Sequence, residues 1–100
     1  MSAYSVDILD STNKNKKLMA IFYDENGKKI KTTHFGASGY EDYTIHKDKE
    51  RRLRYVKRHE GKEDWNDPMK AGTLSLYILW GPYTDLNKCI KYYKKEFGLK

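Results

Sequence analysis

The sequence contains few of the features that support a cross-linked fold or a membrane-spanning one. Its 100 residues include one cysteine, Cys89. A single cysteine excludes a disulfide within the chain and a cysteine-based zinc finger, and it fits a reducing compartment. There is no run of roughly 18 apolar residues that could span a membrane, and the N-terminus lacks the charged and then apolar pattern of a signal peptide. We therefore expect a soluble, intracellular protein without a membrane span.

Motifs for metal binding, phosphate binding and catalysis are also missing. The histidines His34, His46 and His59 do not have the spacing of metal ligands, and neither an HExxH nor an EF-hand pattern occurs. The glycines of "HFGASG" lack the GxGxxG fingerprint. We expect no cofactor, no metal, no small-molecule substrate and no enzymatic activity. A small hydrolase or nuclease that uses His46 or His59 with Asp48 or Glu63 is kept as a third alternative.

Positive charge and aromatic side chains dominate what is present. Lysine and arginine number 20 against 14 acidic residues, which gives a net charge of +6. Only 38% of the residues are hydrophobic, but nine tyrosines and two tryptophans are among them. A few large side chains must therefore supply much of the buried area. The surplus of positive charge favours an anionic partner, which could be nucleic acid, a membrane surface or an acidic protein face.

The first third of the chain reads as an antiparallel meander of three strands. Apolar and polar residues alternate in "YSVDI" (residues 4–8), which is typical of a half-buried strand. "LMAIFY" (residues 18–23) is apolar throughout, as in a central strand covered on both faces. Asn26 and Gly27 predict a hairpin turn, after which residues 29–35 return as the third strand.

A helix is predicted after the loop "GASGYEDY". Asp48 can cap its N-terminus, and the helix runs to about His59 with Leu53 and Val56 on its inner side. Gly61 follows and ends it.

Two further helices complete the pattern. Asp67 is a suitable N-cap with Pro68 at the first helical position, and the mostly apolar residues 71–80 form a buried helix. Thr84 or Asp85 caps a last, amphipathic helix. A chain of this length supports one core. The prediction is an α+β fold in a single domain, residues 1–100, with a β-meander in residues 1–36 and three helices in residues 48–98.

The first predicted helix carries most of the surplus charge. Residues 47–60 hold seven basic and three acidic residues, a net charge of +4. The planar guanidinium of arginine suits phosphate and carboxylate partners. The alternative is a solvated helix face on which Glu50 pairs with Arg54. The candidate residues for contact with an anionic partner are Lys47, Arg51, Arg52, Arg54, Lys57 and Arg58, together with Tyr40, Tyr43 and Trp65.

The aromatic candidates have two interpretations each. Tyr40 and Tyr43 could stack on bases or pack in the core. Trp65 lies in a polar stretch, where it could anchor a protein partner or pack against the fold, whereas core packing is favoured for Trp80. Cys89 is expected to be a small buried hydrophobe in the last helix.

The motif order HFGA, GYEDYTIHKD, RHEGKEDWNDPMKAG and ILW, between about His34 and Phe97, resembles a family of small uncharacterised proteins encoded by large nucleocytoplasmic DNA viruses of algae and amoebae. The resemblance implies a viral origin and supplies no catalytic residue. It also implies a location in the virion or in the cytoplasm of an infected host cell, because many small basic proteins of such viruses are virion components.

Two functions follow from these expectations. The first is a non-enzymatic structural or interaction protein, a minor capsid component whose Arg51, Arg52, Arg54 and Arg58 bind acidic surfaces of other virion proteins while Trp65 anchors. The alternative is a small nucleic-acid-binding module that contacts phosphates through residues 47–58. The sequence leaves both open, because the same side chains attract phosphates and carboxylates.

Overall fold

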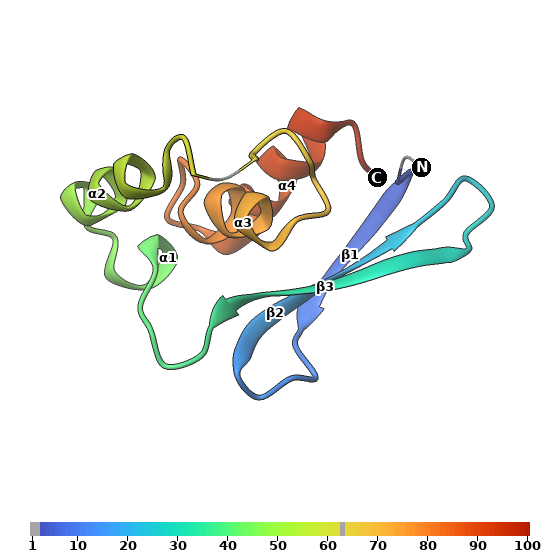
Figure 1. Cartoon of the computed structure of the whole chain (residues 1–100), viewed down its shortest axis with the longest axis horizontal. Coiled ribbons are helices and arrows are strands. Elements are labelled where there is room, and N and C mark those ends of the chain that lie inside the picture. Colours follow the sequence, from blue (N-terminus) through green and yellow to red (C-terminus); the bar gives the residue numbers. More distant parts are fainter. Residues whose placement is uncertain (1–2, 63) are drawn as a thin grey trace.

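The computed structural model describes residues 3–62 and 64–100, which form an α+β fold. Three antiparallel strands make one sheet in the order β1-β2-β3, as predicted. Their bounds are β1 Ser5–Asp10, β2 Lys16–Tyr23 and β3 Lys29–Ala37. The helices follow as α1 Tyr43–His46, α2 Lys49–His59, α3 Ala71–Leu74, the π-helix η1 Ser75–Leu79, and α4 Leu86–Phe97. Helices α3 and α4 lie over one side of the sheet, and α1 and α2 lie at the far left of the view in Figure 1.

The sheet is covered on one face only. Leu18, Ala20 and Phe22 of β2 are buried, but the alternate residues between them are half exposed. The expectation that β2 is covered on both faces was therefore wrong. The physical reason is that the helices pack on a single side, so that the period-2 alternation of a two-layer fold applies to β2 as well.

The turn between β2 and β3 has the predicted hairpin chemistry. Gly27 adopts a positive φ of 79°, which glycine tolerates without a Cβ clash. The Asp24 carboxylate accepts hydrogen bonds from the backbone N–H groups of Asn26 and Lys28, both at 2.9 Å. The turn is thus fixed by its own side chains, which sets the register of the third strand.

The core joins the buried face of the sheet to the helices. Val6, Phe22 and Phe35 from the sheet share one apolar cluster with the helical residues Ile78 and Tyr93. The backbone of Lys100 also pairs with β1, because the Val6 N–H donates to the Lys100 carbonyl at 2.9 Å and the Lys100 N–H donates to the Tyr4 carbonyl at 3.1 Å. The C-terminal end of the chain accordingly lies beside the start of β1 in Figure 1.

Two helix caps were predicted correctly. The Asp48 side chain accepts from the N–H groups at the start of α2, and the Asp85 side chain does the same for α4. The short helix α1 was missed, although Asp42 caps it by accepting from the Thr44 N–H at 2.9 Å. Lys47 ends α1 in the left-handed region at φ 57°.

The start of the second predicted helix was wrong by a few residues. Helix α3 begins at Ala71, and Asp67 instead accepts from the Met69 N–H in a turn at 3.0 Å. The carbonyl groups in this turn are used by distant donors, since the Tyr93 hydroxyl donates to Pro68 and the Thr33 hydroxyl donates to Met69. These contacts attach the turn to α4 and to β3, and the helix begins only after it.

Residues 71–79 are helical as predicted, but the second half is a π-helix. The Trp80 N–H donates to the Ser75 carbonyl at 3.0 Å, five residues earlier. The chain then turns at Gly81, where an added Cβ would lie 2.2 Å from the Tyr77 carbonyl oxygen. Only glycine fits so close an approach. No helix among residues 3–62 and 64–100 is long and apolar enough to cross a bilayer.

Cys89 is fully buried, as predicted, and its thiol donates to the Tyr83 carbonyl at 3.1 Å. Burial raises the pKa of this thiol. The reactive thiolate is therefore scarce in the folded protein at neutral pH.

We expect Cys89 to resist alkylation until the protein unfolds. With iodoacetamide at pH 8, the native protein should react far more slowly than the same protein in urea, because both burial and the raised pKa protect the sulfur. Mass spectrometry of the labelled fraction against time measures both rates. Equal rates in the two conditions would contradict the buried position.

Candidate functional site

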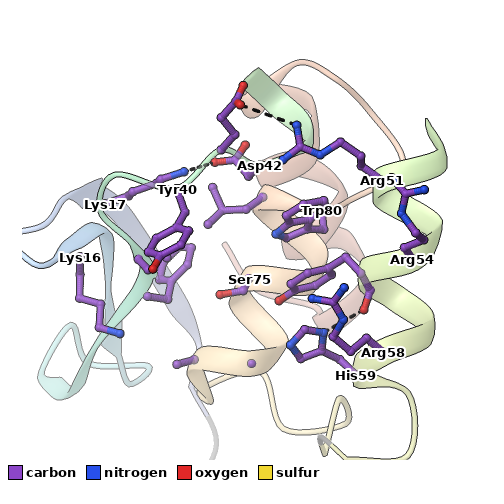
Figure 2. Close-up of a pocket in the computed structure, with 18 residues that line it drawn as sticks. Lys16, Lys17, Tyr40, Asp42, Arg51, Arg54, Arg58, His59, Ser75 and Trp80 are labelled. Atoms are coloured by element: carbon purple, nitrogen blue, oxygen red, sulfur yellow. Dashed lines mark hydrogen bonds and ion pairs between the residues drawn. The ribbon is translucent and has the colours of Figure 1, made fainter. Parts of the chain in front are cut away.

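A cleft of about 610 Å³ lies between the sheet and α2. Residues of β2, β3 and the loop after β3 form one side, α2 forms the other, and residues of α3 and η1 lie between them. Figure 2 shows Lys16 and Tyr40 on one side, Arg54, Arg58 and His59 on the opposite side, and Ser75 and Trp80 between. The volume is within the usual range for sites that enclose a small ligand.

Two acidic residues at the cleft are already paired. The Asp42 carboxylate is 2.6 Å from the Lys17 ammonium, and the exposed fractions of the two side chains are 4% and 20%. Glu41 lies 3.6 Å from the Arg51 guanidinium in a more exposed pair. Asp42 also caps α1, so this buried pair attaches the start of α1 to β2. These contacts neutralise Lys17 and Arg51 within the protein.

Three other cations of the cleft have no such partner. Lys16, Arg54 and Arg58 line the cleft, and none of them forms an ion pair with a carboxylate of the described chain. They come from both sides, because Lys16 belongs to β2 and the two arginines belong to α2. Like charges around a concave surface produce a positive potential that attracts anions.

The cleft side of α2 follows from helical spacing. Residues three or four apart share a face of a helix. Arg51, Arg54 and Arg58 therefore form one stripe, and Tyr55 and His59 lie beside it at the same cleft. No residue of α2 is fully buried. The helix is consequently held in place by something other than the hydrophobic core.

Arg52 makes one of the contacts that hold α2. Its Nε donates to the carbonyl oxygens of Trp80 and Gly81, at 2.9 and 2.8 Å. Its guanidinium carbon lies 5.7 Å from the centre of the Tyr43 ring, within the range of a cation–π contact. Arg52 thus connects α2 to the end of η1 and does not line the cleft.

A stack of rings makes the other contact. Tyr55 lies parallel to Trp80, with ring centres 4.2 Å apart and planes at 2°. His59 is 4.1 Å from the same Tyr55 ring, so it must cover the opposite face. The His59 Nδ1 is 2.8 Å from the Tyr55 carbonyl oxygen, which can only accept, so Nδ1 is the donor. His46 also lies near Trp80, with ring centres 5.3 Å apart and planes tilted by 54°.

The inner side predicted for α2 was partly wrong. Leu53 is 61% exposed, whereas Val56 is half buried. The face that meets the rest of the protein is set by the hydrogen bonds of Arg52 and the stacking of Tyr55. These two contacts turn Leu53 outwards.

The structure separates the predicted contact residues into two groups. Four of them line the cleft, namely Tyr40, Arg51, Arg54 and Arg58. Five do not, namely Lys47, Arg52, Tyr43, Lys57 and Trp65. Tyr43 is 4% exposed and therefore cannot offer a ring face, Trp65 is half buried, and Lys47 and Lys57 point to solvent away from the cleft.

Sequence reasoning missed the residues on the other side of the cleft. Lys16 and Lys17 end the polar stretch "STNKNKK", and nothing in that stretch indicates that β2 faces the basic helix. Trp80, which was expected in the core, packs against the core and also lines the cleft. Ser75 reaches the cleft from the first residue of η1.

Some of the residues considered for hydrolysis or metal binding make contacts within the fold. The part of the chain that the structure describes contains no group of three or more His, Cys, Asp and Glu side chains that could hold a metal ion. Asp48 caps α2, and the His46 Nδ1 accepts the Asp48 N–H at 2.9 Å. Glu63 lies outside the described residues.

The sequence model of a family described as "Family of unknown function (DUF5754)" matches residues 6–59. The chain belongs to this family. The DUF5754 match extends from β1 to the end of α2 and so contains Lys16 and the arginines of the cleft, whereas α3 and η1 lie beyond it. No curated protein and no solved structure matches the chain.

We expect Arg52→Ala to destabilise the protein more than Arg54→Ala. The first change leaves two carbonyl oxygens without their charged donor and should lower the free energy of unfolding by about 1–3 kcal/mol. Arg54→Ala removes an exposed side chain with no ion pair among the described residues. It should change the free energy of unfolding by less than about 0.5 kcal/mol. Urea unfolding measures both, and equal stabilities would contradict the role given to Arg52.

Proposed function

We propose that this protein is a non-enzymatic nucleic-acid-binding module, and that the cleft contacts phosphate groups. The observation that carries the proposal is the meeting of Lys16, Arg54 and Arg58 at one cleft without acidic partners among the described residues. These cations come from elements that are distant in the sequence.

A solvated helix face does not account for this arrangement. Basic residues that serve only solubility can point in any direction, as Lys57 does on the same helix. Here the fold places β2 and α2 so that their cations face a common space, although like charges repel each other in the free protein. A bound phosphate relieves that repulsion, and arginine can donate two parallel hydrogen bonds to it.

The shape of the site favours nucleic acid over the surface of an acidic protein. The cations line a concave space bounded by the aromatic residues Tyr40, Tyr55 and Trp80. Phosphate groups with aromatic bases have the chemistry that matches cations beside an exposed ring such as that of Tyr40. A flat or convex acidic surface would reach only the rim of such a cleft.

We expect Arg58→Glu to weaken binding of a labelled oligonucleotide, with Lys57→Glu as its control. The two changes alter net charge equally and lie at neighbouring positions of α2, but only Arg58 lines the cleft. Fluorescence anisotropy should show a several-fold larger loss for Arg58→Glu. The slope of log affinity against log salt should also fall by about 1 or more, because at least one phosphate contact is lost.

Two results would contradict the proposal. One is an equal loss of affinity for the two variants, which would mean that net charge alone matters. The other is an absence of binding by the unmodified protein at low salt. Poly-glutamate and unlabelled oligonucleotide are compared as competitors at the same concentration of negative charge, and poly-glutamate should displace the labelled oligonucleotide poorly. Equal displacement by the two competitors would favour an acidic protein partner.

A capsid-associated role in a large DNA virus is the second candidate. The observation behind it is the exposure of Ile45 on α1 and Leu53 on α2, at 55% and 61%, because burial of these apolar side chains against a protein partner would be favourable. In this proposal the arginines would face acidic surfaces of other virion proteins.

We expect a capsid-associated protein to remain with purified virions after a high-salt wash and nuclease treatment. Salt weakens contacts to phosphates strongly, whereas an interface with buried apolar area persists. Immunoblotting of washed particles measures the retained fraction. Release of the protein together with the digested nucleic acid would contradict the capsid role and favour the first proposal.

A further inference from the structure

We infer that the ligand of the cleft is a single strand, and that one of its bases stacks on Tyr40 while its phosphates face Arg54 and Arg58. The inference rests on the proposed nucleic-acid function and adds the form of the ligand and the residue that selects it.

Tyr40 has the exposure expected of a binding residue. Its side chain is 73% exposed, the largest value among the exposed large hydrophobic residues of the described chain. Within residues 3–62 and 64–100, its ring meets no other aromatic ring and its hydroxyl makes no hydrogen bond. The ring therefore contributes little to the fold, although leaving so large an apolar surface in water is unfavourable.

The position of the ring is nevertheless defined by its neighbours. Gly39 has a positive φ of 85°, which turns the chain immediately before Tyr40. Two residues later, the side chain of Asp42 pairs with Lys17 and caps the N-terminus of α1. The ring thus projects into the cleft from a loop that is fixed close by, on the side opposite Arg58 and His59 (Figure 2).

The other tyrosines near the cleft are not available for a base. Tyr55 has Trp80 on one face and His59 on the other, at 4.2 and 4.1 Å between ring centres. Tyr43 is 4% exposed and lies under the guanidinium of Arg52. Tyr40 is consequently the tyrosine of the cleft whose ring faces are open to a ligand.

A free ring face selects unpaired bases. In a duplex each base is stacked between its neighbours, so its faces cannot cover a protein side chain. In a single strand the bases can separate and stack on an aromatic ring, which is how sequence-tolerant single-strand sites operate. A cleft of about 610 Å³ has the size of a site for a small molecule, so it suits individual nucleotides of a strand better than a duplex.

The test compares Tyr40→Ala with Tyr83→Ala. Tyr83 is also exposed, at 45%, but does not line the cleft. Each variant and the unmodified protein are titrated with a single-stranded oligonucleotide, the duplex of the same sequence, an abasic strand of the same length, and the corresponding mononucleotide. The abasic strand keeps the phosphates and removes the bases. Thermal unfolding of each variant verifies that it is folded.

We expect the unmodified protein to bind the single strand more tightly than the duplex or the mononucleotide. Tyr40→Ala should lower the affinity for the intact strand by about tenfold, as loss of one base–aromatic stack predicts. It should leave the affinity for the abasic strand unchanged, and Tyr40→Trp should restore binding of the intact strand. Tyr83→Ala should have no effect on any of the four ligands.

Three results would overturn the inference. They are equal losses for the intact and abasic strands, binding of the duplex as tightly as the single strand, and binding of the mononucleotide as tightly as the strand. The Arg58→Glu measurement keeps the two proposals distinct. If Arg58→Glu weakens binding and Tyr40→Ala does not, the phosphate contact stands and the stacked base is lost.

Discussion

The attachment of α2 to the end of η1 is the constraint on which the cleft depends. Helix α2 has no fully buried residue, so it is positioned by the hydrogen bonds of Arg52 to two carbonyls and by the stacking of Tyr55 on Trp80. Without these contacts the basic stripe would belong to a free, solvated helix. With them, Arg54 and Arg58 are held opposite Lys16. A polar and aromatic attachment therefore decides what the charges of α2 can do.

The arginines of α2 accordingly divide by role, although they are adjacent in the sequence. Arg52 orients the helix, Arg51 is paired with Glu41, and Arg54 and Arg58 line the cleft without an ion pair to any carboxylate that the structure describes. Helical geometry produces this division, because successive residues point about 100° apart around the axis. The number of basic residues in a run is thus an upper limit on the number that can bind a partner. Basic residues on the helix face that packs against the protein are not available, so the actual number is lower.

Sequence reasoning succeeded where the signal is local. The alternation of residues 4–8, the Asn26-Gly27 turn and the caps Asp48 and Asp85 depend on neighbouring residues, and all four are found in the structure. It failed where distant groups decide the outcome, as beside Asp67, where the hydroxyls of Tyr93 and Thr33 donate to backbone carbonyls and attach the turn to the rest of the fold. The cleft belongs to the second kind, because the register of β2 and the docking of α2 both lie beyond what spacing along the chain can indicate.

The π-helix η1 makes the site tolerant of one change in the length of the chain. A π-turn is in effect an α-helix that contains one extra residue, and the wider turn absorbs that residue. Deletion of a single residue between Ser75 and Leu79 would therefore restore α-helical winding and leave the side chains on either side of η1 facing the same way. Trp80 would keep the face on which Tyr55 stacks, and its carbonyl would stay within reach of Arg52. In this part of the chain, a one-residue deletion in a related sequence would alter the cleft less than a substitution of Trp80.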